Sequence, residues 1–459
     1  MKLSLAFVSK RLRAGIAAHP LASVALLAAV ARIGVGIILA VTNRTISIAP
    51  DQAEYMVIAQ WAAHGTLTAA RWDGYGRQLF GSTATFAAPL TALVWLGGSH
   101  LVFGQLIAGL FGCVAAVLTT MLVLEVTKKR LAIVAGALVA VWPSQVIWSS
   151  VALRESMVWT SLIGLALLFS RLTRARSDSS AVLLGLAIIL TLWGLVHLRD
   201  QTFLVVAWAL LVGACLVHYP RQWIVRLLAL LVVLALPLLS GLGIGGLNLV
   251  SKDSGNLGTI RANMALGAKS AIVSATSGAK SAIVSATSAT TTTTVPSSEP
   301  PQPGAGLAAV TAANNSTMSN VRFLPRGVVA FLVRPFPWQH STSTSFTLAR
   351  VETVLWWPLY VLAIAGAWVG LRKRRTATIF PFITIGSLVF VNALIQGNLG
   401  TSFRQRAQLF SLLLFFACLA VQEFMTRRAS ISGTRQQEPI VYGVSKEETQ
   451  RSEEARVGV

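Results

Sequence analysis

Two carboxylates follow the first long apolar run, in the segment Asp51-x-x-Glu54-Tyr55. Asp51 and Glu54 are three residues apart, so on a helix they share one face. A carboxylate held beside a hydroxyl group can take its proton as a general base. Asp51 also follows Pro50, where it could simply cap a short helix. The stretch 71–76, rich in aromatic residues and glycine, comes next and favours a functional site.

Charged side chains recur where later apolar runs begin or end. Arg154 and Glu155 are neighbours, and His197, Arg199 and Asp200 form a second group. Ionisable groups at membrane depth are costly, so their presence there indicates function. Each group also has a plainer interpretation, namely a local ion pair or an arginine that reaches up to the membrane surface.

A further group lies in the segment Gly397–Arg406, whose glycines permit a tight turn. Arg404 and Arg406 present forked N–H groups that match phosphate oxygens. The alternative is an ordinary turn with solvated arginines. Arg32 stands near the middle of the first apolar run and must face other helices, where either a structural pair or a catalytic role would suit it.

Motifs for several other chemistries do not occur in the sequence. The six histidines show no metal-ligand spacing, and there is neither a Gly-x-x-x-x-Gly-Lys loop nor a His-Glu-x-x-His motif. We therefore do not expect a nucleotide hydrolase or a zinc hydrolase. No cofactor and no metal site is predicted, although the sequence does not decide whether a divalent metal is required.

The composition indicates a membrane protein. Of the 459 residues, 54% are hydrophobic and 12% are charged, whereas about a quarter of residues are charged in soluble domains. The net charge of +22 could indicate a nucleic-acid partner, but the cations stand between apolar runs. We therefore expect a lipid bilayer, and no nucleic acid, as the partner.

A helix that crosses a bilayer needs about 20 mostly apolar residues. This rule predicts an all-α polytopic bundle of about ten transmembrane helices: 21–42, 101–123, 131–150, 156–170, 181–197, 202–218, 223–245, 352–371, 376–396 and 408–425. The apolar segment 86–98 is too short to cross and could form an interfacial helix.

Lys and Arg accumulate in alternate connections between the expected helices. The basic groups are near the N-terminus and at 128–130, 171–176, 221–226, 372–375 and 427–428. Cytoplasmic loops carry such an excess, so both termini are predicted to be cytoplasmic in a multi-pass protein of the plasma membrane. The candidate site residues then share the outer face.

The expected organisation has five parts. They are a cytoplasmic segment 1–20, a membrane module 21–245 with a first outer loop 43–100, a long outer loop 246–350, C-terminal transmembrane helices 351–425, and a disordered cytoplasmic tail 426–459. The long loop contains a low-complexity stretch, 267–306, in which 267–277 recurs identically as 278–288. An amphipathic interfacial helix is expected near 322–338.

Residues 21–200 resemble the polytopic GT-C glycosyltransferases of the protein O-mannosyltransferase and lipid A aminoarabinose transferase type. The resemblance rests on an acidic residue just after the first span, then a Pro-containing apolar segment, then further hydrophobic helices. The matching segments are Asp51-x-x-Glu54-Tyr55, Ala88-Pro89-Leu90 with Leu96-Gly97-Gly98, and Trp142-Pro143 followed by Leu153-Arg154-Glu155.

The resemblance implies an inverting transfer of a sugar from a polyprenyl-phosphate donor to a glycan, lipid or protein acceptor in the cell envelope. Asp51 would be the general base, assisted by Glu54. Cations would hold the leaving phosphate. The candidate binding residues are Arg154, Glu155, His197, Arg199, Asp200, Arg404 and Arg406.

Three other functions are compatible with a chain of this kind. A polymerase or ligase of surface polysaccharide would also use outer arginines on a multi-span scaffold. A glycolipid transporter would need no reaction at all, but transporters tend to contain broken helices at mid-membrane and repeated groups of spans. A membrane scaffold without chemistry is the third.

Overall fold

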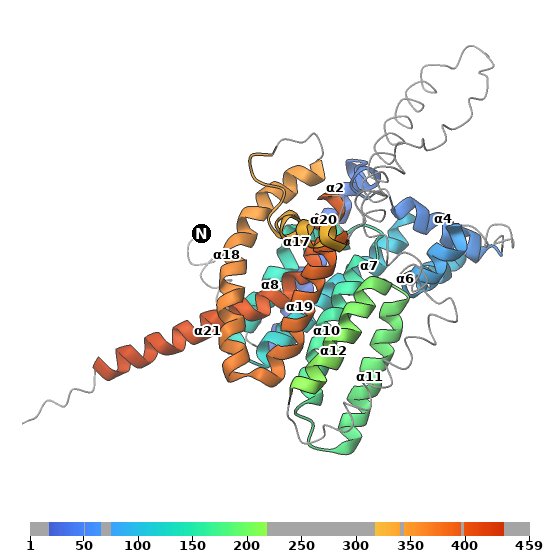
Figure 1. Ribbon diagram of the computed structural model, residues 1–459. Helices are drawn as coiled ribbons and strands as arrows, with labels where there is room; N and C mark the ends of the chain where they lie inside the picture. The colour runs from blue at the N-terminus through green and yellow to red at the C-terminus, as the bar shows by residue number, and fades with distance from the viewer. Residues whose placement is uncertain are drawn as a thin grey trace, which may run out of the picture.

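The computed structural model describes residues 18–49, 51–65, 75–217, 317–339, 344–395 and 399–435. Within these ranges all regular structure is helical, and the helices pack into a bundle (Figure 1). The expected span 223–245, the repeat region 267–306 and the tail beyond residue 435 lie outside the described residues.

The helices follow one another along the chain with mostly short connections. In chain order they are α2 (Pro20–Val41), α3 (Thr45–Ile48), α4 (Gln52–Ala63), α6 (Tyr75–Gly97), α7 (Leu101–Leu124), α8 (Lys129–Val141), α9 (Pro143–Ser149), α10 (Glu155–Leu172), α11 (Asp178–Val196), α12 (Asp200–Leu216), α17 (Thr317–Leu332), α18 (Thr344–Lys373), α19 (Arg375–Ile395), α20 (Leu399–Arg406), the 3-10 helix η1 (Ala407–Leu409) and α21 (Phe410–Arg435).

Eight of the described helical segments are long and apolar enough to cross a membrane, and the bent pair α8–α9 makes a ninth if it counts as one span. The all-α, multi-span bundle expected from the sequence is therefore confirmed. Helix α12, with 17 residues, is as long as the expected span 202–218, but it counts among the shorter apolar helices and not among the eight. Helix α21 continues to Arg435, beyond the point at which the sequence indicated a disordered tail.

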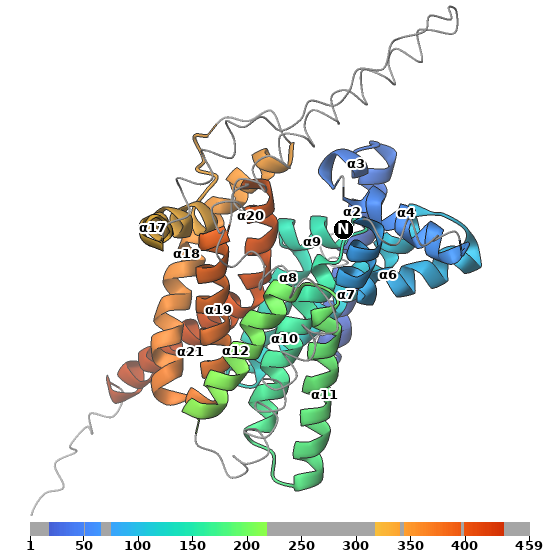
Figure 2. The ribbon, with the colours of Figure 1, turned by 45° about the vertical axis from the view of Figure 1, so that its right-hand side comes forward.

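Helix α6 is longer than the interfacial segment 86–98 expected from the sequence, because it runs from Tyr75 to Gly97. It qualifies as a span by length and composition, yet Ser82 and Leu90 in its interior both lie at one end of the bundle. The Ser82 carbonyl accepts a hydrogen bond from Arg154, just before α10. Leu90 lies beside Gly104, in the first turn of α7. Helix α6 therefore lies across the end of the bundle, next to α4 (Figure 2).

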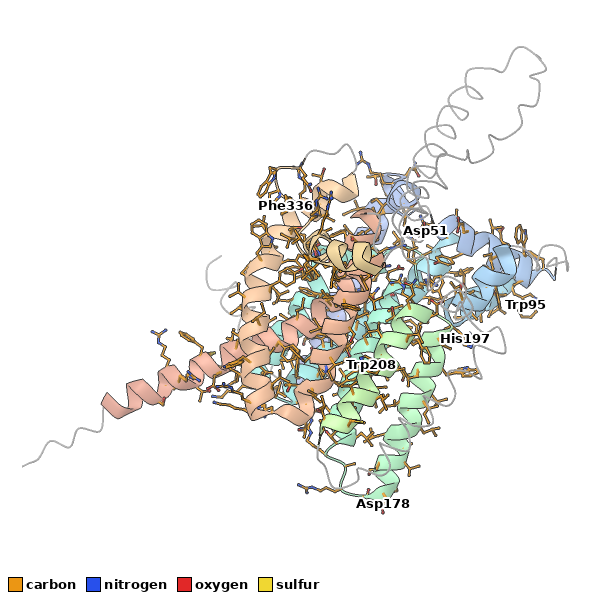
Figure 3. All side chains as sticks on the ribbon, in the orientation of Figure 1. Asp51, Trp95, Asp178, His197, Trp208 and Phe336 are labelled. Atoms are coloured by element: carbon orange, nitrogen blue, oxygen red, sulfur yellow. The ribbon has the colours of Figure 1, made fainter. Side chains whose placement is uncertain are left out.

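The two ends of the bundle differ in charge. The α4 end comprises α4, α6, the segment 150–154 and the turn 197–199. The opposite, basic end comprises the connections 125–130 and 171–177 and the end of α18. At the basic end Glu125 pairs with Arg171 and Arg174, and Lys373 pairs with Glu423. Figure 3 labels Asp51 at the α4 end and Asp178 at the basic end.

The expected span 131–150 is broken into two helices, α8 and α9. The helix bends by 55° between α8 and α9, because Pro143 has no N–H to donate and its ring disrupts the preceding turn. The break leaves the Ser144 N–H without a helical partner, and it donates instead to Glu352 Oε2 at 2.9 Å. The Ser144 hydroxyl donates to Glu352 Oε1 at 2.6 Å.

A buried cation occupies the other side of this break. Arg32 donates to the carbonyls of Ala140, near the end of α8, and of Ala28, at 3.2 and 3.0 Å. A helix carries partial positive charge at its start and partial negative charge at its end. Glu352 at the start of α9 and Arg32 at the end of α8 therefore stabilise the break from both sides.

Helix α17 overlaps the expected interfacial segment 322–338 as far as Leu332. It ends at Leu332, before the cis peptide bond Arg334-Pro335, and lies crosswise to α18 and α19 (Figure 2). A Cβ at Gly327 would be 2.0 Å from the Ala393 carbonyl oxygen, so α17 packs closely on α19. After it, Phe336 and Trp338 stack with ring centroids 5.0 Å apart.

The contact between α18 and α21 also depends on a glycine. A Cβ at Gly366 would be 1.7 Å from the carbonyl oxygen of Phe416, which is backbone and cannot move aside cheaply. We expect Gly366→Ala to lower the free energy of unfolding by roughly 1–3 kcal/mol, measured as a lower midpoint of thermal unfolding in detergent. Gly386→Ala on α19 is the matched control, because no atom is within 4 Å of its Cβ position. Equal midpoints for the two variants would contradict this packing.

Candidate functional site

A buried carboxylate forms the centre of the α4 end. Glu155 is the first residue of α10, and its side chain is 2% exposed. Arg199 Nη2 donates to Glu155 Oε1 at 2.7 Å. Arg404 Nε forms an ion pair with the same oxygen at 3.2 Å. Both contacts join segments that are far apart in the chain.

Arg404 bridges this buried carboxylate to a more accessible one. Its Nη1 donates to Asp51 Oδ2 at 2.7 Å, and the Asp51 side chain is 42% exposed. Asp51 occupies the N-cap position of α4, but its side chain makes no capping hydrogen bond. Its carboxylate is therefore engaged by Arg404 and does not serve as a helix cap.

Arg154 fixes the loops around these groups. Its Nη1 donates to the carbonyl of Leu198 at 2.6 Å and to that of Ser82 at 3.3 Å. It thereby ties the turn 197–199 and helix α6 to the start of α10. Asp51, Arg154, Glu155, Arg199 and Arg404 together are called the arginine cluster below.

The arginine cluster carries a surplus of positive charge, because it has three guanidinium groups and two carboxylates. Arg199 Nη1 and Arg154 Nε are buried and have no hydrogen-bond partner. Buried polar groups that lack a partner are rare and costly. An anion with several acceptor oxygens would balance the charge and satisfy these donors.

Tyr55 is a member of the site that the sequence indicated only as part of a motif. It is buried on α4, and its ring meets Phe86 edge to face with centroids 5.4 Å apart. Burial raises the pKa of its phenol, against the opposing effect of Arg154. The phenol therefore stays neutral at physiological pH. Its spacing of four residues from Asp51, about one helical turn, is the signal that could have identified it.

Three of the predicted site residues lie outside the arginine cluster. Glu54 is exposed on α4. His197, labelled in Figure 3, places Nδ1 3.3 Å from the Gly81 carbonyl and its ring against Trp193. Asp200 accepts a hydrogen bond from the Gln201 N–H at 2.8 Å. His197 and Asp200 thus bond to nearby backbone groups.

Arg406 points away from Arg404. It is fully buried, and its Nη1 donates to the carbonyls of Leu332 and Arg334 at 2.8 and 3.1 Å. Its Nη2 donates to the Thr353 hydroxyl at 3.0 Å. Successive residues of a helix are rotated by about 100°, so two residues two positions apart face nearly opposite sides. Arg406 holds the end of α17, and Arg404 reaches the arginine cluster.

Two further observations bear on the identity of the site. Within the described ranges no group of three His, Cys, Asp or Glu side chains is arranged to hold a metal ion. A comparison of the chain with protein-family models and with curated proteins gives no match.

Replacement of Glu155 and replacement of Asp51 should differ sharply in their effect on the free energy of unfolding. Glu155→Gln leaves the buried Arg199 and the partly buried Arg404 without their shared anion, and we expect it to lower the free energy of unfolding by about 3–5 kcal/mol. Asp51→Asn breaks a half-exposed pair, for which about 0–1 kcal/mol is typical. Thermal unfolding in detergent measures both. Comparable losses would show that Glu155 is not the centre of the cluster.

Proposed function

We propose that this protein is an integral membrane glycosyltransferase. It moves a sugar from a polyprenyl-phosphate-linked donor to an acceptor of the cell envelope. The observation that carries the proposal is the contact of Arg404 with both Asp51 and Glu155. That contact sets an accessible carboxylate beside a group of arginines with spare positive charge, as a transfer from a phosphate leaving group requires.

Asp51 acts as the general base in this proposal. It takes the proton of the acceptor hydroxyl while the hydroxyl oxygen attacks the anomeric carbon of the sugar. The bond between that carbon and the phosphate oxygen breaks, and the electron pair leaves with the phosphate. Attack from the side opposite the phosphate inverts the anomeric carbon. Glu54, three residues along α4, assists in orienting the acceptor.

The arginines stabilise the leaving phosphate. Arg404 exchanges part of its contact with Asp51 for a phosphate oxygen when the donor enters, which frees the carboxylate to accept a proton. Arg154 contributes a buried N–H group that lacks a partner, and Arg199 contributes its positive charge. Fixed cations in a site with little water stabilise developing charge more strongly than they would in solution. Glu155 is too buried to meet the acceptor, so it positions Arg199 and Arg404.

The proposed location is the plasma membrane, with the α4 end at its outer face. The cations at 128–130, 171–176 and 372–374 belong to the basic end, and such an excess is typical of cytoplasmic loops. Nucleotide sugars are not available at an outer face. A lipid carrier that brings the activated sugar across the membrane would supply the donor.

A glycolipid transporter is the second candidate, because one observation favours it. The α8–α9 helix is broken by 55°, and discontinuous helices are common at transport sites. However, Glu352 and Arg32 hold this break on both sides. Movement of a glycolipid across vesicle membranes without any sugar transfer would support the transporter.

Replacement of the base tests the transferase directly. We expect Asp51→Asn to abolish sugar transfer, because the amide cannot accept the proton, while thermal stability and donor binding stay close to those of the wild type. The measurement compares envelope glycans between a strain that lacks the protein and strains restored with the wild-type chain or the variant. Full restoration by Asp51→Asn would refute Asp51 as the base.

Arg404→Lys tests the phosphate contact. Lysine keeps the positive charge that Glu155 needs but loses the guanidinium fork that reaches two groups at once. We expect the apparent affinity for a polyprenyl-phosphate-linked sugar to fall by about tenfold or more. Arg372→Lys at the basic end is the matched control, and its affinity should not change. Unchanged affinity in Arg404→Lys would remove Arg404 from the donor site.

A further inference from the structure

A small polar pocket adjoins the arginine cluster on the other side of Arg199. It lies between α12 and α19, next to α20 and η1, and has room for about one water molecule. Valine and leucine side chains form part of its wall. Its polar lining consists of Arg199, Gln201, Thr202, Asn392, Gln405 and Gln408.

Two side chains of this lining carry buried atoms without a partner. Arg199 uses Nη2 to bind Glu155, but its Nη1 has no acceptor. Gln405 Oε1 has no donor. Both residues are more than nine-tenths buried. The pocket is therefore lined by one residue with an unsatisfied donor and one with an unsatisfied acceptor.

The chemistry of the lining distinguishes between possible ligands. A phosphate group offers acceptors, so it would satisfy Arg199 and leave Gln405 Oε1 without a donor. A hydroxyl group both donates and accepts, as do the side-chain amides and the threonine hydroxyl around it. A hydroxyl group also has about the size of the water that the pocket can hold, whereas a phosphate is larger.

We propose that this pocket receives a hydroxyl group of the carbohydrate part of a lipid-linked substrate. The phosphate of the same molecule lies against the arginine cluster, so Arg199 stands between the two binding positions. This inference rests on the proposed function for the phosphate. The preference of the pocket for a hydroxyl group is a separate property and can be tested separately.

Asn392 allows the pocket to be altered away from the arginine cluster. It lies on α19, and its Nδ2 donates to the Leu388 carbonyl within the same helix. Asn392→Leu keeps the approximate size of the side chain and removes its amide from the pocket. Thr384→Val is the matched control, because Thr384 is also buried on α19, also lacks a partner for its hydroxyl, and does not line the pocket.

The experiment measures binding by the purified full chain in detergent. The probes are a short-chain polyprenyl phosphate and the same lipid phosphate carrying glucose, mannose, galactose or arabinose. For the glycosylated probe that binds most tightly to the wild type, we expect Asn392→Leu to weaken binding about three- to tenfold. Binding of the bare lipid phosphate should not change, and Thr384→Val should affect neither probe.

The possible outcomes separate the two proposals. If Asn392→Leu binds both probes as tightly as the wild type does, the pocket holds a bound water only. If its affinity falls equally for both probes, the pocket does not recognise the sugar. Either result overturns the inference. In another outcome, a glycosylated probe binds the wild type and binds Asn392→Leu more weakly, while the bare lipid phosphate binds neither. That result supports the hydroxyl pocket and contradicts the phosphate site. If no probe binds the wild type, both proposals fail.

Discussion

The burial of one carboxylate governs how the α4 end is assembled. Glu155 begins α10 at a position closed to solvent, and an ionised group there is tolerated only when it is paired. Its partners come from the turn between α11 and α12 and from α20, near the end of the chain. Arg404 extends the pairing to Asp51 before α4. Segments separated by most of the sequence thus meet around one oxygen, Glu155 Oε1.

The same physical rule applies at the break between α8 and α9. Pro143 prevents the helix from continuing, and the backbone groups that it leaves without helical partners are bonded by Glu352 and Arg32. These two side chains come from α18 and α2, so they attach the broken helix to both halves of the chain. The segment after α9 leads directly to Arg154 and Glu155. A fixed break therefore sets the direction from which these residues enter the site.

Much of the fold could be predicted from the sequence, because the ability to cross a membrane depends mainly on the length and apolar character of a local segment. The spans near α2, α7, α10, α11, α18 and α19 were predicted in this way. The path of α6 could not be predicted in this way, since a long apolar helix can either cross the bilayer or lie along it. Its contacts with Arg154 and with the start of α7 place it across the α4 end of the bundle. The break at Pro143 was missed because a proline can also be accommodated within a helix, as Pro358 is in α18.

The sequence is enough to predict an all-α membrane bundle with candidate site residues at the ends of its helices, since residue types and the ends of apolar runs are local properties. It did not separate Arg404 from Arg406, or Glu155 from Asp200, because each pair looks equivalent when only sequence position is considered. Tertiary structure decided these roles. Asp51 and Arg404 are 353 residues apart in the chain, and which arginine meets which carboxylate depends on how the helices between them pack.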